Sequence, residues 1–329
     1  MAGKRMFITG GVGAIHEDEK FGPDYFLPTD AYLETCAAVG AGFFSQRMNQ
    51  LTCNARYMDE VERVLYNNVL TGVSLSGDKY TYQNPLNTDK PDRWEWHVCP
   101  CCPPMFLKIM AAMPGYIYAY QGDNVYVNLF IGSEVRIPVG DNSVRLKQLT
   151  SYPWHGAVSI QVNPDKASTF SMKVRIPGWA QGTENPYDLY QSNLKAPVKL
   201  KVNQEDVLLR IVDGYAEINR EWKKGDHIEL ELPMQPRLIT ANKAVENLRG
   251  QVALASGPII YCFEDADNPE LQTFKLQAQT PLELSHDSNL LNGVNIIKCQ
   301  GDIPAKAIPY YAVANREESH SYKVWIPQK

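Results

Sequence analysis

The sequence predicts an α+β protein of several domains, with a helical first part followed by antiparallel β-sandwich domains. Apolar residues recur every three or four positions within residues 31–70, which is typical of helices packed on one face. After Gly115 apolar and polar residues alternate instead, which is typical of half-buried strands. The chain has 329 residues, more than the roughly 100 to 200 of one ordinary domain, so several hydrophobic cores are expected.

The helical pattern covers two stretches of the first part. We expect one helix from Ala31 to Gln50 and a second from Met58 to Leu70. The second stretch shows the spacing most clearly, with apolar residues at Met58, Val61, Leu65 and Val69. This spacing places all four on one helix face.

The alternating pattern continues to the end of the chain. It is clearest in residues 116–120, 125–131 and 169–176. Pairs such as Gly-Asp, Pro-Gly and Asn-Pro separate the runs, so they predict short antiparallel strands joined by turns. A seam is expected near residues 233–242, between two such groups of strands. We therefore predict a helical segment over 1–119, a β-sandwich over 120–235 and a second β-rich domain over 236–329.

Composition excludes several functional classes. The net charge is −5 and the isoelectric point is near 5.7, so the basic excess of nucleic-acid-binding proteins is missing. No apolar run approaches the roughly 18 residues of a membrane-spanning helix, and residues 1–9 lack the apolar core of a signal peptide. We expect a cytoplasmic protein with neither nucleic acid nor membrane as partner.

Three of the seven cysteines fall in one short motif, Cys99-Pro-Cys-Cys-Pro-Pro104. An odd and clustered set of cysteines favours a metal site or reactive thiols over a disulfide framework. The two prolines can begin a helix, which would place the thiols at its positive end and favour thiolates. The alternative is that these are small buried thiols packed beside a turn.

A second motif places a carboxylate two residues before another thiol, in Tyr32-Leu-Glu-Thr-Cys36. Residues i and i+2 point to different sides of a helix, so Glu34 and Cys36 can share a metal only where the helix begins. Together with Cys101 and Cys102 they form a candidate zinc set of three sulfurs and one oxygen. The alternative is an ordinary helix-entry glutamate followed by a core cysteine.

These motifs, together with several others, resemble glycoside hydrolase family 127, the β-L-arabinofuranosidases. The other similar strings are Phe7-Ile-Thr-Gly-Gly-Val-Gly13, Glu19-Lys-Phe-Gly-Pro-Asp-Tyr25, Tyr80-Thr-Tyr-Gln-Asn-Pro85 and Ile308-Pro-Tyr-Tyr-Ala-Val-Ala-Asn315. The resemblance implies that residues 1–119 are the C-terminal part of an (α/α)6 barrel, since twelve helices need a longer segment.

The resemblance also implies the activity and the residues that carry it. It implies a retaining hydrolase that releases L-arabinose from β-L-arabinofuranosides, such as plant glycan oligosaccharides, through a zinc-bound cysteine nucleophile. The nucleophile would be Cys101, and Glu19 would be the general acid and base, with Glu17 as the other candidate. Glu34, Cys36 and Cys102 would complete the Zn²⁺ shell around Cys101, and Tyr82 would line the sugar pocket.

The sequence departs from the family pattern at Met105, where asparagine is usual, and at His97, where a small residue is usual. We interpret His97 as a packed or solvated residue, the alternative being a more distant partner of a thiolate. We expect the enzyme to be complete only together with an N-terminal half-barrel chain. Alternatively, we expect the exposed helices to bind a second copy of the chain. The competing hypothesis is an inactive zinc-containing β-sandwich module that binds carbohydrate or a partner chain.

Overall fold

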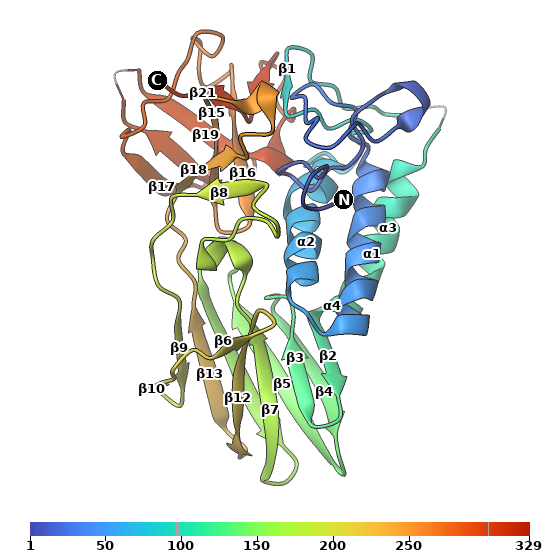
Figure 1. Ribbon diagram of the computed structural model, residues 1–329, viewed down its shortest axis with the longest axis vertical. Helices are drawn as coiled ribbons and strands as arrows, with labels where there is room; N and C mark the ends of the chain where they lie inside the picture. Colours follow the sequence, from blue (N-terminus) through green and yellow to red (C-terminus); the bar gives the residue numbers. More distant parts are fainter. Residues whose placement is uncertain (97–98, 302) are drawn as a thin grey trace.

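A computed structural model describes residues 1–96, 99–301 and 303–329. The chain is mostly β-sheet, with its longer helices gathered on one side of the molecule (Figure 1). The α-helices are α1 (Thr35–Thr52), α2 (Arg56–Val64), α3 (Cys102–Ala112) and α4 (Pro114–Ile117). A π-helical turn, Leu65–Val69, extends α2, and short 3-10 helices span Glu17–Glu19, Gly178–Gln181, Glu246–Leu248 and Tyr310–Ala312.

Helices α1, α2 and α3 pack together through their apolar faces. Ala38 and Val39 of α1, Val61 and Val64 of α2, and Ile109 of α3 are all fully buried in one core. The same core continues into the β-sheets that follow in the chain. The helices therefore form a layer on the sheets and are not a separately packed bundle.

Two sheets formed by residues 118–231 face each other at the lower end of Figure 1. One has the order β11-β12-β7-β3-β2, with β2 Tyr118–Gln121, β3 Asn124–Val127, β7 Ser168–Arg175, β11 Ile211–Val212 and β12 Tyr215–Trp222. The other has the order β10-β9-β13-β6-β5-β4, with β4 Ser133–Val139, β5 Asn142–Thr150, β6 Ala157–Pro164, β9 Lys199–Val202, β10 Glu205–Asp206 and β13 Asp226–Glu231. Inward side chains of both sheets, such as Phe170 and Ile160, meet in the main core. Neighbouring strands are antiparallel except β3 and β7.

The third sheet contains most strands of the C-terminal part. Its main path is β17-β18-β19-β16-β15-β14-β8, with β8 Tyr190–Ser192, β14 Arg237–Ala241, β15 Gln251–Ser256, β16 Ile259–Glu264, β17 Leu282–Asp287, β18 Val294–Cys299 and β19 Ala305–Pro309. Strands β1 (Asn87–Thr88), β20 (Tyr322–Lys323) and β21 (Ile326–Pro327) join it beside this path. The pairing of β1 with β20 ties the helical segment to the end of the chain.

A buried group of charges joins α2 to the sheets. The guanidinium of Arg175, on β7, pairs with the carboxylates of Asp59 and Glu62 on α2. Glu62 also accepts hydrogen bonds from Tyr152 Oη at 2.8 Å and from Trp179 Nε1 at 3.2 Å. Because these groups are removed from water, each charge depends on its partners.

The expected helices and strands are present with shifted ends. The first expected helix is α1, the second is α2 with its π-helical turn, and the run at 116–120 divides between α4 and β2. Within the described ranges, every helix is too short or too polar to cross a lipid bilayer.

Candidate functional site

Three sulfur atoms from two separate motifs meet at one point. The Sγ atoms of Cys36, Cys101 and Cys102, here called the thiol cluster, all lie within 4.8 Å of one another. Cys36 Sγ is 3.4 Å from Cys101 Sγ, and Cys101 Sγ is 3.8 Å from Cys102 Sγ. Cys102 is buried, and the other two are half-buried. One side of the group is therefore open to a ligand.

Two helix N-termini create this arrangement. Cys36 is the second residue of α1, Cys101 is the N-cap of α3 and Cys102 is its first residue. Pro103 and Pro104 occupy the first turn of α3, where their missing N–H groups cost no helical hydrogen bond. Both helices begin at the sulfurs, so their positive ends favour negative charge there, while burial opposes it.

Glu34 lies next to the thiol cluster because it precedes α1. It is the N-cap residue of α1, with an extended backbone (φ −75°, ψ 140°). Its Oε2 atom accepts a hydrogen bond from Cys36 Sγ at 3.2 Å, and its Oε1 atom accepts one from Tyr32 Oη at 2.7 Å. The carboxylate is buried, so these contacts hold its orientation.

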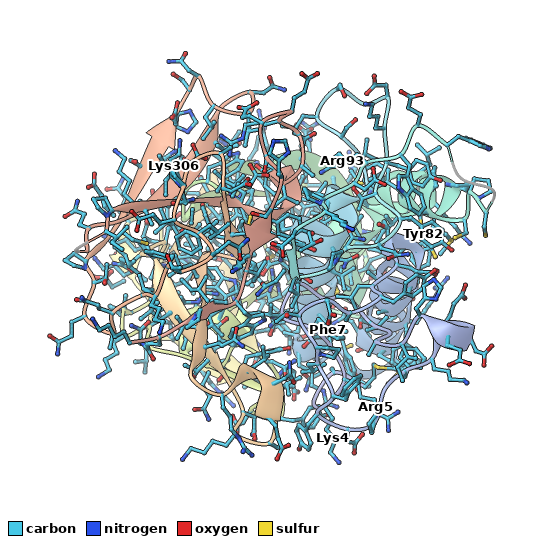
Figure 2. The ribbon with its side chains drawn as sticks, turned by 90° about the horizontal axis from the view of Figure 1, so that it is seen from above. Lys4, Arg5, Phe7, Tyr82, Arg93 and Lys306 are labelled. Carbon is cyan, nitrogen blue, oxygen red and sulfur yellow. The ribbon has the colours of Figure 1, made fainter. Side chains whose placement is uncertain are left out.

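Aromatic rings surround the sulfurs. Tyr82 Oη lies 3.6 Å from Cys101 Sγ, and the Tyr82 ring stacks on Trp94 with 5.5 Å between centroids. Tyr32 packs against Tyr82 at 6.3 Å. Figure 2 shows Tyr82 on the helical side of the molecule, across from Lys306 in the C-terminal part.

The environment of the protein alone favours neutral thiols. Burial raises the pKa of Cys101 to about 11. The neighbouring Cys102, followed by burial, raises the pKa of Cys36 well above its usual range. Deprotonating these sulfurs at neutral pH therefore requires a positive charge beside them.

The donor set fits a zinc ion. Two sulfurs bound to one tetrahedral zinc at about 2.3 Å would lie about 3.8 Å apart, and the two closest pairs lie at 3.4 and 3.8 Å. The Glu34 carboxylate supplies an oxygen next to Cys36. Three sulfurs and one oxygen make a chemically suitable four-ligand set.

Glu19 and Glu17 lie apart from this group. Both are exposed, on the turn Glu17–Glu19, and Glu19 has a positive φ of 51°. Within the described residues, the Glu19 carboxylate has no hydrogen bond or ion pair. The turn nevertheless borders the site, because the ring of His16 packs edge-on against Tyr32 at 4.6 Å. His97, by contrast, lies outside the described residues.

Two residues of the site were not predicted. Tyr32, which binds Glu34, stands in the Tyr32-Leu-Glu-Thr-Cys36 motif, so its position two residues before the carboxylate was an available signal. No sequence motif indicated that Trp94 belongs to the site. Its ring reaches Tyr82 because the backbone of Trp94 pairs with that of Tyr80 across a loop.

Three family models match the chain in succession. The GH127 catalytic domain of the β-L-arabinofuranosidases matches residues 1–115, the GH127 middle domain matches 124–234, and the C-terminal domain of glycoside hydrolase family 127 matches 236–327. Together they extend over nearly the whole sequence.

Similar proteins carry the same family name. A non-reducing end β-L-arabinofuranosidase of Bifidobacterium longum subsp. longum is 31% identical over 95% of this chain and 52% of its own length. A solved GH127 β-arabinofuranosidase superposes with a TM-score of 0.95 and 36% identity, covering 100% of this chain and 54% of that one. A GH127 β-L-arabinofuranosidase of Geobacillus stearothermophilus T6 gives a TM-score of 0.91 and 35% identity, covering 99% and 55%.

The chain spans about half the length of these relatives. The thiol cluster lies within the part matched by the catalytic-domain model, and the sheets lie within the parts matched by the other two. The chain thus belongs to glycoside hydrolase family 127.

Proposed function

We propose that this chain carries the catalytic thiols of a retaining glycoside hydrolase that releases L-arabinose from β-L-arabinofuranosides. The observation that carries the proposal is the convergence of Cys36, Cys101 and Cys102 beside the buried carboxylate of Glu34. The names of the relatives supply the sugar, since each is called an arabinofuranosidase.

Glu34, Cys36, Cys101 and Cys102 would hold one zinc ion. Zinc, when bound, keeps its coordinating thiols deprotonated at neutral pH. Tyr32 holds the Glu34 carboxylate through Oε1, while Cys36 binds Oε2. The protein thus orients its oxygen ligand before any metal arrives.

Cys101 is the nucleophile in this proposal. Cys101 and Cys36 are both half-buried, whereas Cys102 is buried. The resemblance to the family assigns the attack to Cys101, whose sulfur also lies 3.6 Å from Tyr82 Oη. Its sulfur attacks the anomeric carbon and forms a C–S bond, while the C–O bond to the leaving group breaks and Glu19 donates a proton to the departing oxygen. Glu19 then takes a proton from water, which displaces the sulfur and releases the sugar with retained configuration. Glu19 must move toward the sugar for these steps.

We expect one zinc per chain when the protein is purified in reducing buffer without added metal. The reason is that three sulfurs already lie within 4.8 Å of one another, with the Glu34 carboxylate 3.2 Å from the sulfur of Cys36. Cys102→Ser is expected to reduce the zinc content severalfold, whereas Cys53→Ser, at a half-buried thiol outside the cluster, keeps it. Elemental analysis by mass spectrometry measures both, and near-zero zinc in the unaltered protein would remove the metal site.

We further propose that an active enzyme includes another helical segment, which completes an (α/α)6 barrel with the helices described above. Large apolar side chains point outward from α1 and α3, where Phe44 is 65% exposed, Leu51 79% and Leu107 67%. Exposed apolar surface of this kind usually binds a partner. A second copy of the chain could cover it in the absence of the segment.

The isolated chain is therefore expected to self-associate and to hydrolyse an aryl β-L-arabinofuranoside poorly. Leu107→Lys should reduce self-association by placing a charge in the apolar contact, whereas Leu208→Lys, at a 92% exposed site in the β part, should not. Light scattering and an assay with and without the added helical segment test this. A monodisperse monomer that turns over at ordinary rates, about 1 to 1,000 per second, would contradict the need for a partner.

A second candidate function follows from the exposed position of Glu19, which lies on the surface without a partner in the described part of the chain. On this alternative the chain is an inactive zinc-containing β-sandwich module that binds carbohydrate or a partner chain. Zinc content does not separate the two functions, but hydrolysis does. If no preparation, with or without the helical segment, hydrolyses the aryl arabinofuranoside, the alternative holds.

A further inference from the structure

A cavity of about 690 Å³ lies at the junction between the C-terminal sheet and the two facing sheets of residues 118–231. Figure 1 shows the C-terminal sheet above the facing sheets. Residues of β17 and β18 line one side of the cavity, and the segments 154–157, 196–199 and 231–235 contribute the rest. Glu34 and the thiol cluster are not among the described residues that line it, so the cavity is separate from the proposed catalytic site.

The cavity continues along the outer face of one sheet. A second hollow, of about 410 Å³, shares Ala157, Lys199 and Glu231 with it. Glu231 lies directly opposite Ala157 on β6 and Lys199 on β9, so these residues form one row across the sheet. Lys201 and Glu229, which lie opposite each other in the next row, also line the second hollow. The two hollows together, here called the junction groove, have an elongated outline that suits a chain of several units.

Trp154 gives the junction groove a half-buried aromatic ring. The ring packs against Tyr311 with 6.1 Å between centroids, and the backbone N–H of Trp154 donates to the carbonyl oxygen of Ser151 at 2.9 Å. Across the described ranges, the Nε1–H group of Trp154 donates to no protein atom. An oriented ring with an open N–H group combines an apolar surface with a polar one, which suits ligands that have both.

His286 and Asn295 place a second open nitrogen in the groove. They lie directly opposite each other on β17 and β18, with His286 Nδ1 3.0 Å from Asn295 Oδ1. The amide nitrogen of Asn295 donates to the carbonyl oxygen of Trp154 at 3.1 Å, so its Oδ1 atom accepts from His286 Nδ1. The Nε2 atom of the exposed His286 ring has no partner in the described part of the chain. In the neutral imidazole it is an acceptor for a ligand hydroxyl.

The charges that line the junction groove balance. Two lysines, Lys199 and Lys201, stand beside two glutamates, Glu229 and Glu231. Among the described residues, Lys199 and Glu231 form no ion pair, so a donor and an acceptor remain available. A balanced lining gives no net attraction to an anion or a cation. The groove therefore suits a neutral ligand that carries several hydroxyl groups and an apolar face.

We propose that the junction groove binds a neutral oligosaccharide at a site that takes no part in bond cleavage. A sugar ring presents C–H groups that can stack on Trp154, and its hydroxyl groups can bind the Trp154 and His286 nitrogens and the charged row. The volume of 690 Å³ lies within the range of about 300 to 1,000 Å³ for small-molecule sites. Binding here needs neither zinc nor hydrolysis, so the inference goes beyond the proposed function and does not depend on it.

Calorimetric titration of the full chain with neutral trisaccharides tests the groove. The probes are α-linked L-arabinotriose, xylotriose and galactotriose, none of which ends in a β-L-arabinofuranosyl group. At least one should bind, at one site per chain. Trp154→Ala should weaken this binding about tenfold, since it removes the ring and its N–H group. Lys199→Ala, at an exposed position, should weaken it severalfold. Tyr120→Ala, at a 57% exposed aromatic residue on β2 in the other sheet, is the matched control and should leave the affinity unchanged.

The outcomes separate the groove from the proposed function. If no probe binds, or if Trp154→Ala and Lys199→Ala bind as tightly as the unaltered chain, the groove is not a sugar site. If Trp154→Ala does not fold, Lys199→Ala alone decides. Trigalacturonate, which carries a carboxylate on each ring, should bind more weakly than the best neutral probe, and equal or tighter binding would contradict the neutral ligand. In any preparation that hydrolyses an aryl β-L-arabinofuranoside, Lys199→Ala should keep the turnover, and an equal loss of turnover and binding would contradict a separate site.

Discussion

Cys101→Ser is expected to lower the turnover of an aryl β-L-arabinofuranoside on the order of 10⁴-fold or more, in any preparation that hydrolyses it. A serine hydroxyl is a far weaker nucleophile than a thiolate, and the cluster contains no base positioned to activate it. Steady-state kinetics measure the loss. Because Cys101 is also a proposed zinc ligand, zinc content must be measured on the same sample.

Cys99→Ser provides the matched control for this variant. Cys99 belongs to the same motif but is exposed and lies outside the thiol cluster. It should retain turnover within a few fold of the unaltered protein. If Cys101→Ser keeps substantial activity, or if Cys99→Ser loses as much, the nucleophile is assigned to the wrong residue.

Arg175→Met should lower the free energy of unfolding by about 3 to 5 kcal/mol, since it leaves buried carboxylates without their counter-charge. Arg175 is fully buried, and its guanidinium pairs with Asp59 and Glu62 on α2. The pairing joins the helical layer to strand β7, so its loss weakens the contact between them. Urea denaturation followed by circular dichroism measures the change.

The control is another arginine–carboxylate pair in the same β part. Arg136 pairs with Asp165, and the two side chains are 61% and 50% exposed. Arg136→Met should cost at most about 1 kcal/mol, since exposed ion pairs contribute little. Similar losses for the two variants would contradict the role given to the buried charges.

Each half of the thiol cluster is a local motif that could be read from the sequence. The meeting of the two motifs, which lie 65 residues apart, was expected because their sulfurs and carboxylate suit one metal ion. Glu34 and Cys36 are two residues apart, Cys101 and Cys102 are adjacent, and the prolines mark the start of α3. The prediction that Glu34 precedes the helix follows from the opposite directions of residues i and i+2, and Glu34 is indeed the N-cap of α1. Helix spacing likewise indicated α1 and α2, since each buries one face.

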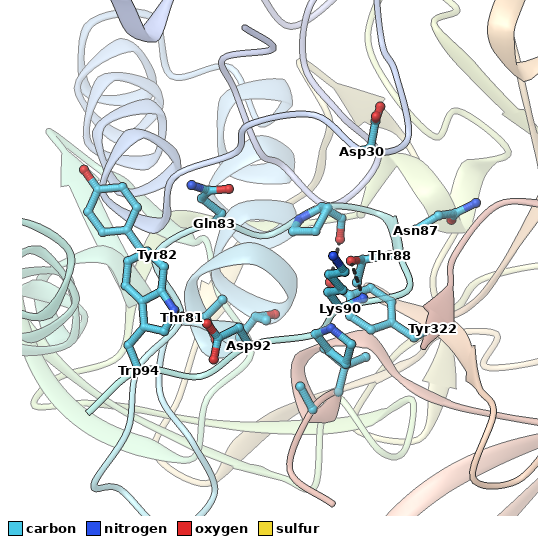
Figure 3. A pocket seen from close by; sticks show the side chains of 15 residues that line it. Asp30, Thr81, Tyr82, Gln83, Asn87, Thr88, Lys90, Asp92, Trp94 and Tyr322 are labelled. Atoms are coloured by element: carbon cyan, nitrogen blue, oxygen red, sulfur yellow. Dashed lines mark hydrogen bonds between the residues drawn. The ribbon is translucent and has the colours of Figure 1, made fainter. Parts of the chain in front are cut away.

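The contacts that depend on distant segments could not be predicted. Strands β1 and β8 are two and three residues long, too short for alternation to appear, and they exist because β20 and β14 pair with them. A cavity lined by Tyr82, Val313 and Tyr322 (Figure 3) has the same origin, because Val313 and Tyr322 come more than 200 residues after Tyr82. No local pattern indicates which distant strand or loop will supply a wall.

The most direct test of the proposed mechanism is to locate the sugar on the protein during turnover. In a preparation active on an aryl β-L-arabinofuranoside, Glu19→Gln should slow the second step most, since a good leaving group needs no proton but water still needs a base. Acid quenching followed by peptide mass spectrometry should then find one pentosyl group on the peptide that contains Cys101, and fragmentation should place it on that sulfur. A pentosyl group on any other residue, or turnover that inverts the anomeric configuration without an adduct, would contradict the mechanism.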